Sequence, residues 1–253
     1  MINSLSQSHD LAPGSGSART PPDTRIYAIG DVHGRLDLLD GLLRDIAQDS
    51  ENAPKRRVLV TLGDLVDRGA DSAGVVERLL NLHAEPPFDA FELHFLMGNH
   101  DALMARFLDG ANDADASLWL SNGGTETLAG YGVDTGLDFA ALHSEAHARI
   151  PQTHRNFIHG LGLSHREGDY LFVHAGIRPG IALTRQVPDD LMWIREEFLQ
   201  SNADFGCVVV HGHTPLPVPE VRPNRIGIDT KAWLSGTLTC AVLQDTGLHF
   251  LST

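Results

Sequence analysis

Short apolar runs alternate along the first part of the chain with stripes of apolar residues at helical spacing. The runs at 25–29, 57–62 and 91–97 each end in a polar segment that contains glycine. A stripe follows each run, and in the first stripe, residues 36–46, leucine and isoleucine recur mostly three positions apart. Short apolar runs are typical of buried strands, and the helical spacing is typical of an amphipathic helix. The pattern therefore predicts three successive strand–loop–helix units, and with them a largely parallel sheet covered by helices.

The pattern changes twice further along the chain. Residues 110–168 are mostly helical in pattern, with breaks at 121–124 and before Pro151, and we expect a lobe over one edge of the sheet. From Tyr170 onward, strand-like runs return. Three segments near the end alternate apolar and polar residues as antiparallel strands do: 225–229, 238–243 and 248–252. The whole pattern indicates an α/β fold with two packed mixed β-sheets flanked by α-helices.

Composition indicates where the globular part begins. Residues 1–24 are rich in serine, glycine and proline with little apolar content, so we expect a disordered N-terminal tail, with a local docking arm as the alternative. The chain has 253 residues, of which 42% are hydrophobic, and this fits one large domain over 25–253. A formal net charge of -14 argues against a nucleic-acid-binding surface.

The location of the protein follows from its apolar segments and its two cysteines. No stretch approaches the length of a membrane span, and the N-terminus lacks the pattern of a secretory signal, so we expect no membrane contact. Cys207 and Cys240 each lie inside an apolar run without zinc-ligand spacing. We interpret them as buried free thiols, which favours a reducing, cytoplasmic location.

Polar clusters rich in metal-ligand types follow the predicted strands. Five clusters come in chain order: Asp31 with His33, Asp64 with Asp67 and Arg68, Asn99 with His100, His174, and His213. The exits of parallel strands meet at one edge of a sheet, where α/β folds place their sites. Carboxylate, imidazole and amide donors without thiolate suit manganese, iron or zinc. The sequence therefore predicts one site for two divalent ions, an arrangement suited to phosphoryl chemistry.

The motifs around these residues resemble those of a known family. The segments 30–34 (GDVHG), 63–69 (GDLVDRG) and 98–101 (GNHD) resemble the signature motifs of phosphoprotein phosphatases, within the calcineurin-like metallophosphoesterases. The segments 172–176 (FVHAG) and 212–215 (GHTP), with Trp193-Ile194-Arg195, resemble later motifs of the bacterial and phage-type serine/threonine phosphatases. The resemblance spans residues 25 to 243, and it assigns 25–253 to one metallophosphoesterase catalytic domain.

The resemblance implies two divalent metal ions, with manganese the leading candidate and iron or zinc as alternatives. Asp31 and His33 would bind the first ion, and Asp64 would bridge both ions. The ligands of the second ion would be Asn99, His174 and His213. A hydroxide activated by both metals would attack phosphorus in line, without a phosphoenzyme.

The resemblance also implies the remaining roles. His100 would be the general acid that protonates the leaving alkoxide, and Asp67 would hold its imidazole. Arg68 and Arg195 would clamp the phosphate oxygens, with Asn99 near the substrate as well. The implied activity is phosphoric monoester hydrolysis, foremost on phosphoserine and phosphothreonine in proteins, with phosphotyrosine or a small phosphoester as further substrates.

Several alternatives remain open at this stage. His211 is a rival to His213 as a ligand, and Arg178 could line the cleft or lie on the surface. The family usually has glutamate at the position of Asp101. The aspartate in this chain favours dinucleoside polyphosphate hydrolases such as diadenosine tetraphosphatases. That branch usually lacks the aspartate at Asp67, which favours the phosphatase. A broad small-molecule phosphatase and a catalytically silent scaffold are the other readings, and the sequence leaves the oligomeric state open.

Overall fold

The structure of the chain, a computed structural model, describes residues 17–110 and 112–253. Two five-stranded sheets lie against each other, in the strand orders β10-β9-β1-β2-β3 and β4-β5-β6-β8-β7. The first sheet contains β1 (Thr24–Ile29), β2 (Arg56–Thr61), β3 (Glu92–Phe95), β9 (Thr239–Gln244) and β10 (Gly247–Ser252). The second contains β4 (Ser164–Glu167), β5 (Tyr170–Val173), β6 (Val208–His211), β7 (Glu220–Arg222) and β8 (Arg225–Gly227).

The predicted strand–loop–helix units are present. β1, β2 and β3 are parallel neighbours, and each is followed in the chain by a helix. These helices are α1 (Leu36–Ser50), α2 (Ser72–Asn81) and α3 (Asn99–Leu108). The closing strands β9 and β10 are antiparallel to each other, and β9 is antiparallel to β1, as the alternating pattern predicts. Two mixed sheets flanked by helices confirm the predicted fold class.

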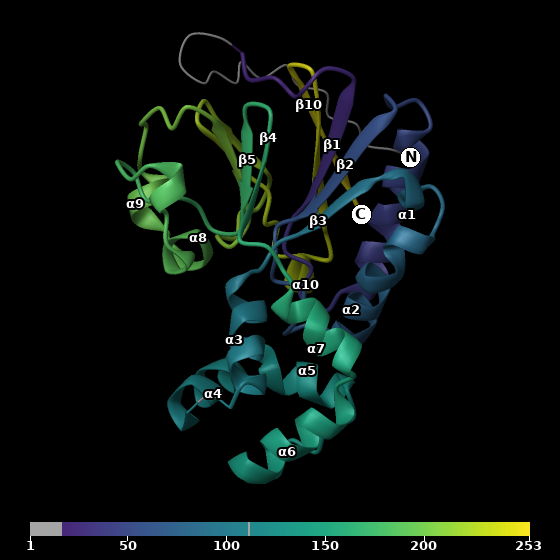
Figure 1. Ribbon diagram of the computed structural model, residues 1–253, viewed down its shortest axis with the longest axis vertical. Helices are drawn as coiled ribbons and strands as arrows, with labels where there is room; N and C mark the ends of the chain where they lie inside the picture. Colours follow the sequence, from purple (N-terminus) through teal and green to yellow (C-terminus); the bar gives the residue numbers. More distant parts are fainter. Residues whose placement is uncertain (1–16, 111) are drawn as a thin grey trace.

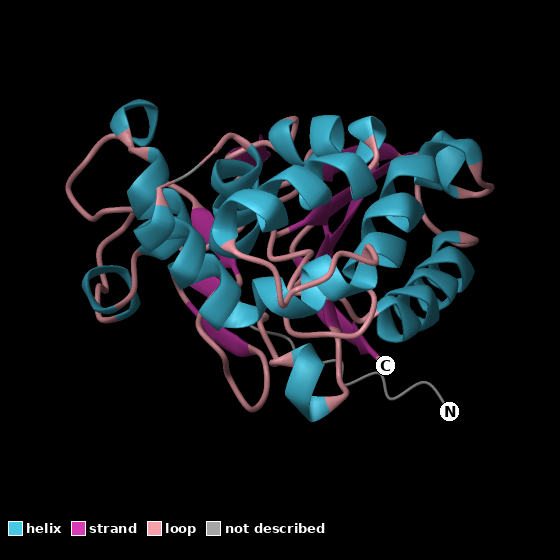
Figure 2. Ribbon diagram, turned by 90° about the horizontal axis from the view of Figure 1, so that it is seen from below, coloured by secondary structure: helices cyan, strands magenta, loops and turns pink. Residues whose placement is uncertain are grey.

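A helical lobe lies below the sheets in Figure 1, and it corresponds to the predicted helical stretch. Its elements are α4 (Asp113–Trp119), a π-helical turn (Leu120–Gly124), α5 (Thr125–Gly130), α6 (Phe139–Arg149) and α7 (Gln152–His159). Seen from below, the helices lie in front of the strands (Figure 2). The break predicted at 121–124 is the π-helical turn, where Gly123 has a φ of 111°. The lobe lies at the ends of the strands of the first sheet (Figure 1).

The remaining helices are short. α8 (Pro188–Trp193) and α9 (Glu196–Leu199) lie beside the second sheet, and α10 (Ala232–Ser235) lies near the lower ends of the strands (Figure 1). Short 3-10 helices span Leu82–Ala84, Phe88–Ala90 and Leu183–Arg185.

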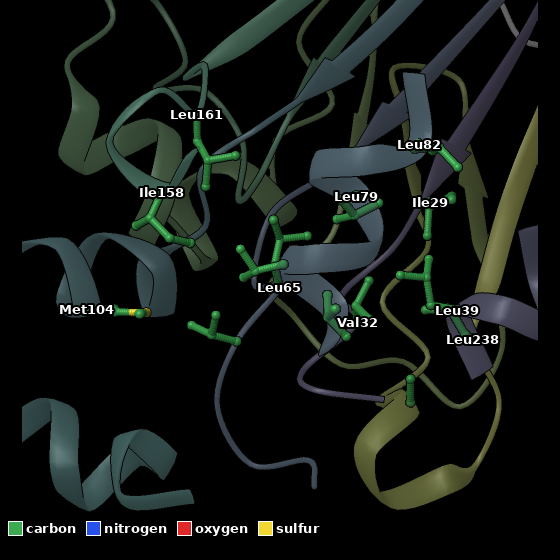
Figure 3. Close-up of a cluster of buried hydrophobic side chains, with 14 of the residues drawn as sticks. Ile29, Val32, Leu39, Leu65, Leu79, Leu82, Met104, Ile158, Leu161 and Leu238 are labelled. Carbon is green, nitrogen blue, oxygen red and sulfur yellow. The ribbon is translucent and has the colours of Figure 1, made fainter. Parts of the chain in front are cut away.

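Alternating side chains of the strands build the core in layers. Along β1, Ile26 and Ala28 face the layer between the two sheets, whereas Tyr27 and Ile29 face the helices. Figure 3 shows part of the helix-side layer, where Ile29 lies near Leu39 of α1. Each fully buried aliphatic side chain stabilises the fold by about 1.5–3 kcal/mol. Because both faces of the central strands β1 and β2 are covered, their buried parts are continuous apolar runs rather than alternating ones.

The structure corrects the predicted tail. The described part of that segment, residues 17–24, is folded onto both sheets rather than disordered. Ala18 is fully buried in the layer between the sheets, and the backbone of Thr20 donates to the carbonyl of Asp245 at 3.0 Å. The carbonyl of Arg19 accepts from the backbone of Asp169 at 3.0 Å. The prediction from composition was wrong for residues 17–24 because backbone hydrogen bonds and few apolar atoms hold this segment. Residues 1–16 lie outside the described part.

A candidate metal centre and its acid–base pair

The five polar clusters meet where the strands end. Asp31, Asp64 and Asn99 follow β1, β2 and β3 of the first sheet, and His174 and His213 follow β5 and β6 of the second. All five residues are at least 95% buried. The predicted convergence at one rim is therefore present, and the rim is built by both sheets together.

Two groups of potential ligand atoms share one carboxylate. His33, Asp64 and His100 offer atoms within 4.8 Å of one another, and so do Asp64, His174 and His213. Asp64 belongs to both groups, so its carboxylate lies between two potential ion positions. That placement fits the bridging role expected for Asp64, but the first group contains His100, the expected acid, and not Asp31, the expected ligand.

Backbone carbonyls fix the orientation of two imidazoles. Nδ1 of His174 lies 2.8 Å from the carbonyl oxygen of Leu62, and Nδ1 of His33 lies 2.9 Å from that of Val66. A carbonyl oxygen only accepts, so Nδ1 carries the proton in both rings and Nε2 presents its lone pair. Nε2 of His33 faces Asp64 Oδ2 at 3.4 Å. Both rings are held in the form that binds a metal.

Asn99 directs its amide oxygen at two histidines. Its Oδ1 lies 3.0 Å from Nε2 of His174 and 2.8 Å from Nδ1 of His213. An asparagine at this position could instead cap the helix that follows, but Gly98 is the N-cap of α3, and the Asp101 carboxylate accepts from its backbone N–H at 2.9 Å. The Asn99 side chain is therefore free to serve the site.

The carboxylates of the site are buried close to one another. Burial raises the pKa of Asp31 well above its usual range, and the charges of Asp229 and Asp64 raise it further. Burial also raises the pKa of Asp64 to about 6. Nε2 of His213 is buried with no hydrogen-bond partner among the described residues. Buried carboxylates next to histidine lone pairs are a donor set that a divalent cation would satisfy, so the residues fit such a metal.

Beside the metal centre, a carboxylate and an imidazole form a close pair. Oδ2 of Asp67 lies 2.7 Å from Nδ1 of His100. The indole of Trp119 donates to Asp67 at 3.0 Å, and the hydroxyl of Thr127 donates at 2.7 Å. Burial raises the pKa of Asp67 to about 8, and the hydrogen bonds from Thr127 and Trp119 oppose that rise. The pair fixes the His100 ring with Nε2 directed at the site.

Arg68 lies over this pair. Its guanidinium places one nitrogen 3.0 Å from Nε2 of His100 and the other 3.5 Å from Nε2 of His33. The lobe approaches here too, because a Cβ on Gly123 would lie 2.6 Å from the Arg68 backbone nitrogen. The break at 121–124 therefore lies directly against the loop that carries Arg68.

Three other candidates lie further out. Arg195 lies at the start of α9 and is exposed. Burial lowers the pKa of His213 to about 2, and the charges of His174 and Arg195 contribute to that shift. The ring of His211 packs against Phe198 with the ring centres 5.1 Å apart, whereas His213 forms a ligand group with Asp64 and His174, so the arrangement favours His213. Arg178 pairs with Asp190 and Glu197 at the surface instead of lining the cleft.

Backbone strain gathers at the same place. Five site residues adopt a positive φ that non-glycine residues rarely take: His33, Asp64, Asp67, Arg68 and His213. Each such conformation costs on the order of 1–3 kcal/mol, and this kind of strain clusters at functional sites. Neighbouring glycines make the close approach possible. A Cβ on Gly212 would lie 2.0 Å from Asp31 Oδ1, and one on Gly98 would lie 2.1 Å from Asp64 Oδ1.

Sequence reasoning missed three residues of the site. Asp229 is buried beside Asp31, and it follows the short strand β8, so the strand-exit pattern could have revealed it. Trp119 and Thr127, which hold Asp67, come from the helical lobe. No local pattern marks them, because their role exists only once the lobe packs against the loop after β2.

Comparison with known proteins gives consistent results. The family model described as calcineurin-like phosphoesterase matches residues 24–248. Serine/threonine-protein phosphatase 1 of Salmonella typhimurium is 30% identical over 227 residues, which cover 87% of this chain and 92% of that protein. An asymmetrical bis(5'-nucleosyl)-tetraphosphatase of Halalkalibacterium halodurans is 25% identical, covering 83% of this chain and 87% of that protein. A cold-active protein-tyrosine phosphatase of a Shewanella species has the same fold, with a TM-score of 0.60 at 18% identity, covering 91% of this chain and 80% of that one.

Proposed function

This chain belongs to the calcineurin-like phosphoesterase family, a family of metal-dependent hydrolases, and we propose that it hydrolyses phosphoserine and phosphothreonine in proteins. The observation that carries the proposal is the Asp67–His100 pair beside the shared carboxylate of Asp64. Such a pair supplies a proton to a leaving alkoxide, which is what a phosphate monoester requires. The 30% identity to a protein named as a serine/threonine phosphatase supports it. Phosphotyrosine is a further substrate class of the same chemistry.

Two divalent metal ions belong to the proposal, with manganese first and iron or zinc as alternatives. Asp31, His33 and Asp64 would hold one ion. The second would be held by Asp64, Asn99, His174 and His213. When bound, the ions polarise the phosphoryl group and lower the pKa of water to supply the nucleophile.

The protein's own residues bind the phosphate and move the proton. Arg68 presents its guanidinium fork to the phosphate oxygens, and the exposed Arg195 approaches from α9. Because Arg68 lies 3.0 Å from Nε2 of His100, a phosphate held by Arg68 brings its leaving oxygen within reach of that nitrogen. To serve as the acid, His100 must carry a proton at Nε2, the atom that accepts from Arg68 at 3.0 Å until the phosphate takes over that guanidinium, and Asp67 keeps the ring in place by accepting from Nδ1.

A dinucleoside polyphosphate hydrolase is the second candidate. Identity of 25% to a protein named as an asymmetrical tetraphosphatase favours it. Asp67 favours the protein phosphatase, since a monoester with a poor leaving group depends on the acid that Asp67 positions. A broad phosphatase of small phosphoesters would use the same residues.

One experiment tests the proposal. Manganese-loaded protein is given a phosphoserine peptide and, separately, diadenosine tetraphosphate, and released phosphate and nucleotides are measured. The proposal predicts peptide turnover that His100→Asn lowers by about 10²–10⁴-fold. His83→Asn, a change at an exposed histidine outside the site, is the matched control. Turnover of the dinucleotide alone would overturn the protein-phosphatase assignment.

A further inference from the structure

The short helix α10 and the residue before it bring a tryptophan and a lysine to the phosphate-binding arginine. Cζ of Arg68 lies 5.2 Å from the centre of the Trp233 ring, and Nζ of Lys231 lies 5.6 Å from the same ring. Both distances are within the range of a cation–π contact. One indole therefore holds two cations, and one of them is the arginine that reaches His100.

The backbone of Lys231 is unusual for a residue with a side chain. It adopts φ 57° and ψ 47°, the left-handed conformation that glycine takes without cost. Its N–H donates to Oδ1 of the buried Asp229 at 2.8 Å, which ties the strained residue to the acidic cluster. A position that favours glycine but holds lysine indicates that the lysine side chain has a use.

The charged amine of Lys231 has no carboxylate partner within the described part of the chain. Neither Lys231 nor Arg68 forms an ion pair with a carboxylate there, although the chain has 33 acidic residues against 19 basic ones. The Trp233 indole nitrogen is buried and has no hydrogen-bond partner among the described residues, so its N–H does not hold the ring in place. Two cations on one ring, without carboxylate partners, form a surface for an anion larger than one phosphate.

We propose that Lys231 binds a second phosphate of the substrate, next to the phosphate that Arg68 holds for hydrolysis, with Trp233 keeping the two cations in place. The proposal rests on the phosphoesterase function proposed above and deepens it. The preferred substrate then carries a neighbouring phosphate, either in a polyphosphate chain or as a second phosphoserine. Lysine binds such a group as a point charge, and arginine binds the first one as a fork.

The test compares substrates with one and with two phosphates. Para-nitrophenyl phosphate has one, whereas inorganic tripolyphosphate and a peptide with adjacent phosphoserines have more. Lys231→Ala should lower the ratio of kcat/KM for the multiply phosphorylated probe to that for para-nitrophenyl phosphate by about tenfold, the effect of losing one charge-assisted contact. Lys231→Arg should restore most of it. A lower kcat/KM ratio with either multiply phosphorylated probe supports the proposal. The probe that is affected shows whether the second phosphate belongs to a polyphosphate chain or to a second phosphoserine, and an unchanged ratio with both probes overturns the proposal.

Lys231→Gly provides a second readout that separates function from folding. Glycine relieves the left-handed strain, so Tm should rise by a few degrees while the same kcat/KM ratio falls. Asp245→Gly is the matched control, because Asp245 has a φ of 51° in the exposed turn between β9 and β10. It should leave the ratio unchanged. A Lys231→Gly variant that keeps the ratio would overturn the proposal, whereas a wild-type protein that cleaves none of the probes would overturn the proposed function instead.

Discussion

Oδ2 of Asp67 lies 2.7 Å from Nδ1 of His100, and two residues of the helical lobe, Trp119 and Thr127, donate to the same carboxylate. The loop after β2 thus places the aspartate, α3 places the histidine, and the lobe fixes both. Because Asp67 is fully buried, the geometry of the pair depends on these contacts rather than on solvent. The lobe is therefore part of the catalytic apparatus that the proposed function requires.

The pair should act as one unit in kinetics. Asp67→Asn should lower kcat by about 10–100-fold, since the imidazole loses the carboxylate that orients it. The double variant with His100→Asn should be no slower than His100→Asn alone, because the aspartate acts only through the histidine. Initial rates on para-nitrophenyl phosphate measure all three variants. Multiplicative losses in the double variant would show that Asp67 has a separate role.

Thr127 should contribute through its hydroxyl. Thr127→Val keeps the shape but leaves Asp67 without its 2.7 Å donor, so the free energy of unfolding should fall by about 1–3 kcal/mol and kcat should fall with it. Urea unfolding and initial rates measure the two effects. Thr125→Val is the matched control: the same change two residues away on α5, at an exposed position. Equal effects of the two substitutions would exclude a specific role for the Asp67 contact.

Gly98 should be essential to the metal centre. A Cβ there would lie 2.1 Å from Asp64 Oδ1 and 2.2 Å from the Asp64 backbone nitrogen, so Gly98→Ala must displace the shared carboxylate. The variant should bind less than two manganese ions per chain and lose activity, which metal analysis by mass spectrometry would quantify. Gly41→Ala, within α1, should keep both ions and gain about 0.5–1 kcal/mol of stability. Full metal content in Gly98→Ala would contradict the close approach.

Much of the site could be predicted from the sequence because each cluster follows an apolar run and is flanked by glycine. Asp31, Asp64 and Asn99 are examples, since strand exits in a parallel sheet converge by geometry alone. Trp119 and Trp233 could not be predicted, because each meets the site only after distant segments have packed. β4 was also missed, since Ser164–Glu167 is polar and becomes a strand by pairing with β5 at the sheet edge.

Removing the metal should make stability depend on pH. In the metal-free protein, burial raises the pKa of Asp64 to about 6 and that of Asp101 to about 7, from an ordinary value of 3.8. A carboxyl whose folded pKa is raised binds its proton more tightly when folded, so it adds stability that is complete below pH 3.8 and is lost progressively between pH 3.8 and the folded pKa values of about 6 and 7. Bound cations compensate the same charges. Tm in a chelator should therefore fall over this window, whereas Tm in manganese should fall less; parallel curves would contradict this account.

The central claim is that one rim binds two metal ions that share Asp64, and anomalous X-ray diffraction from crystals of the manganese-loaded protein tests it most directly. The account predicts two anomalous peaks, one among Asp31, His33 and Asp64 and one among Asp64, Asn99, His174 and His213, with none beside His211. A single peak, or a peak whose ligands exclude Asp64, would contradict it.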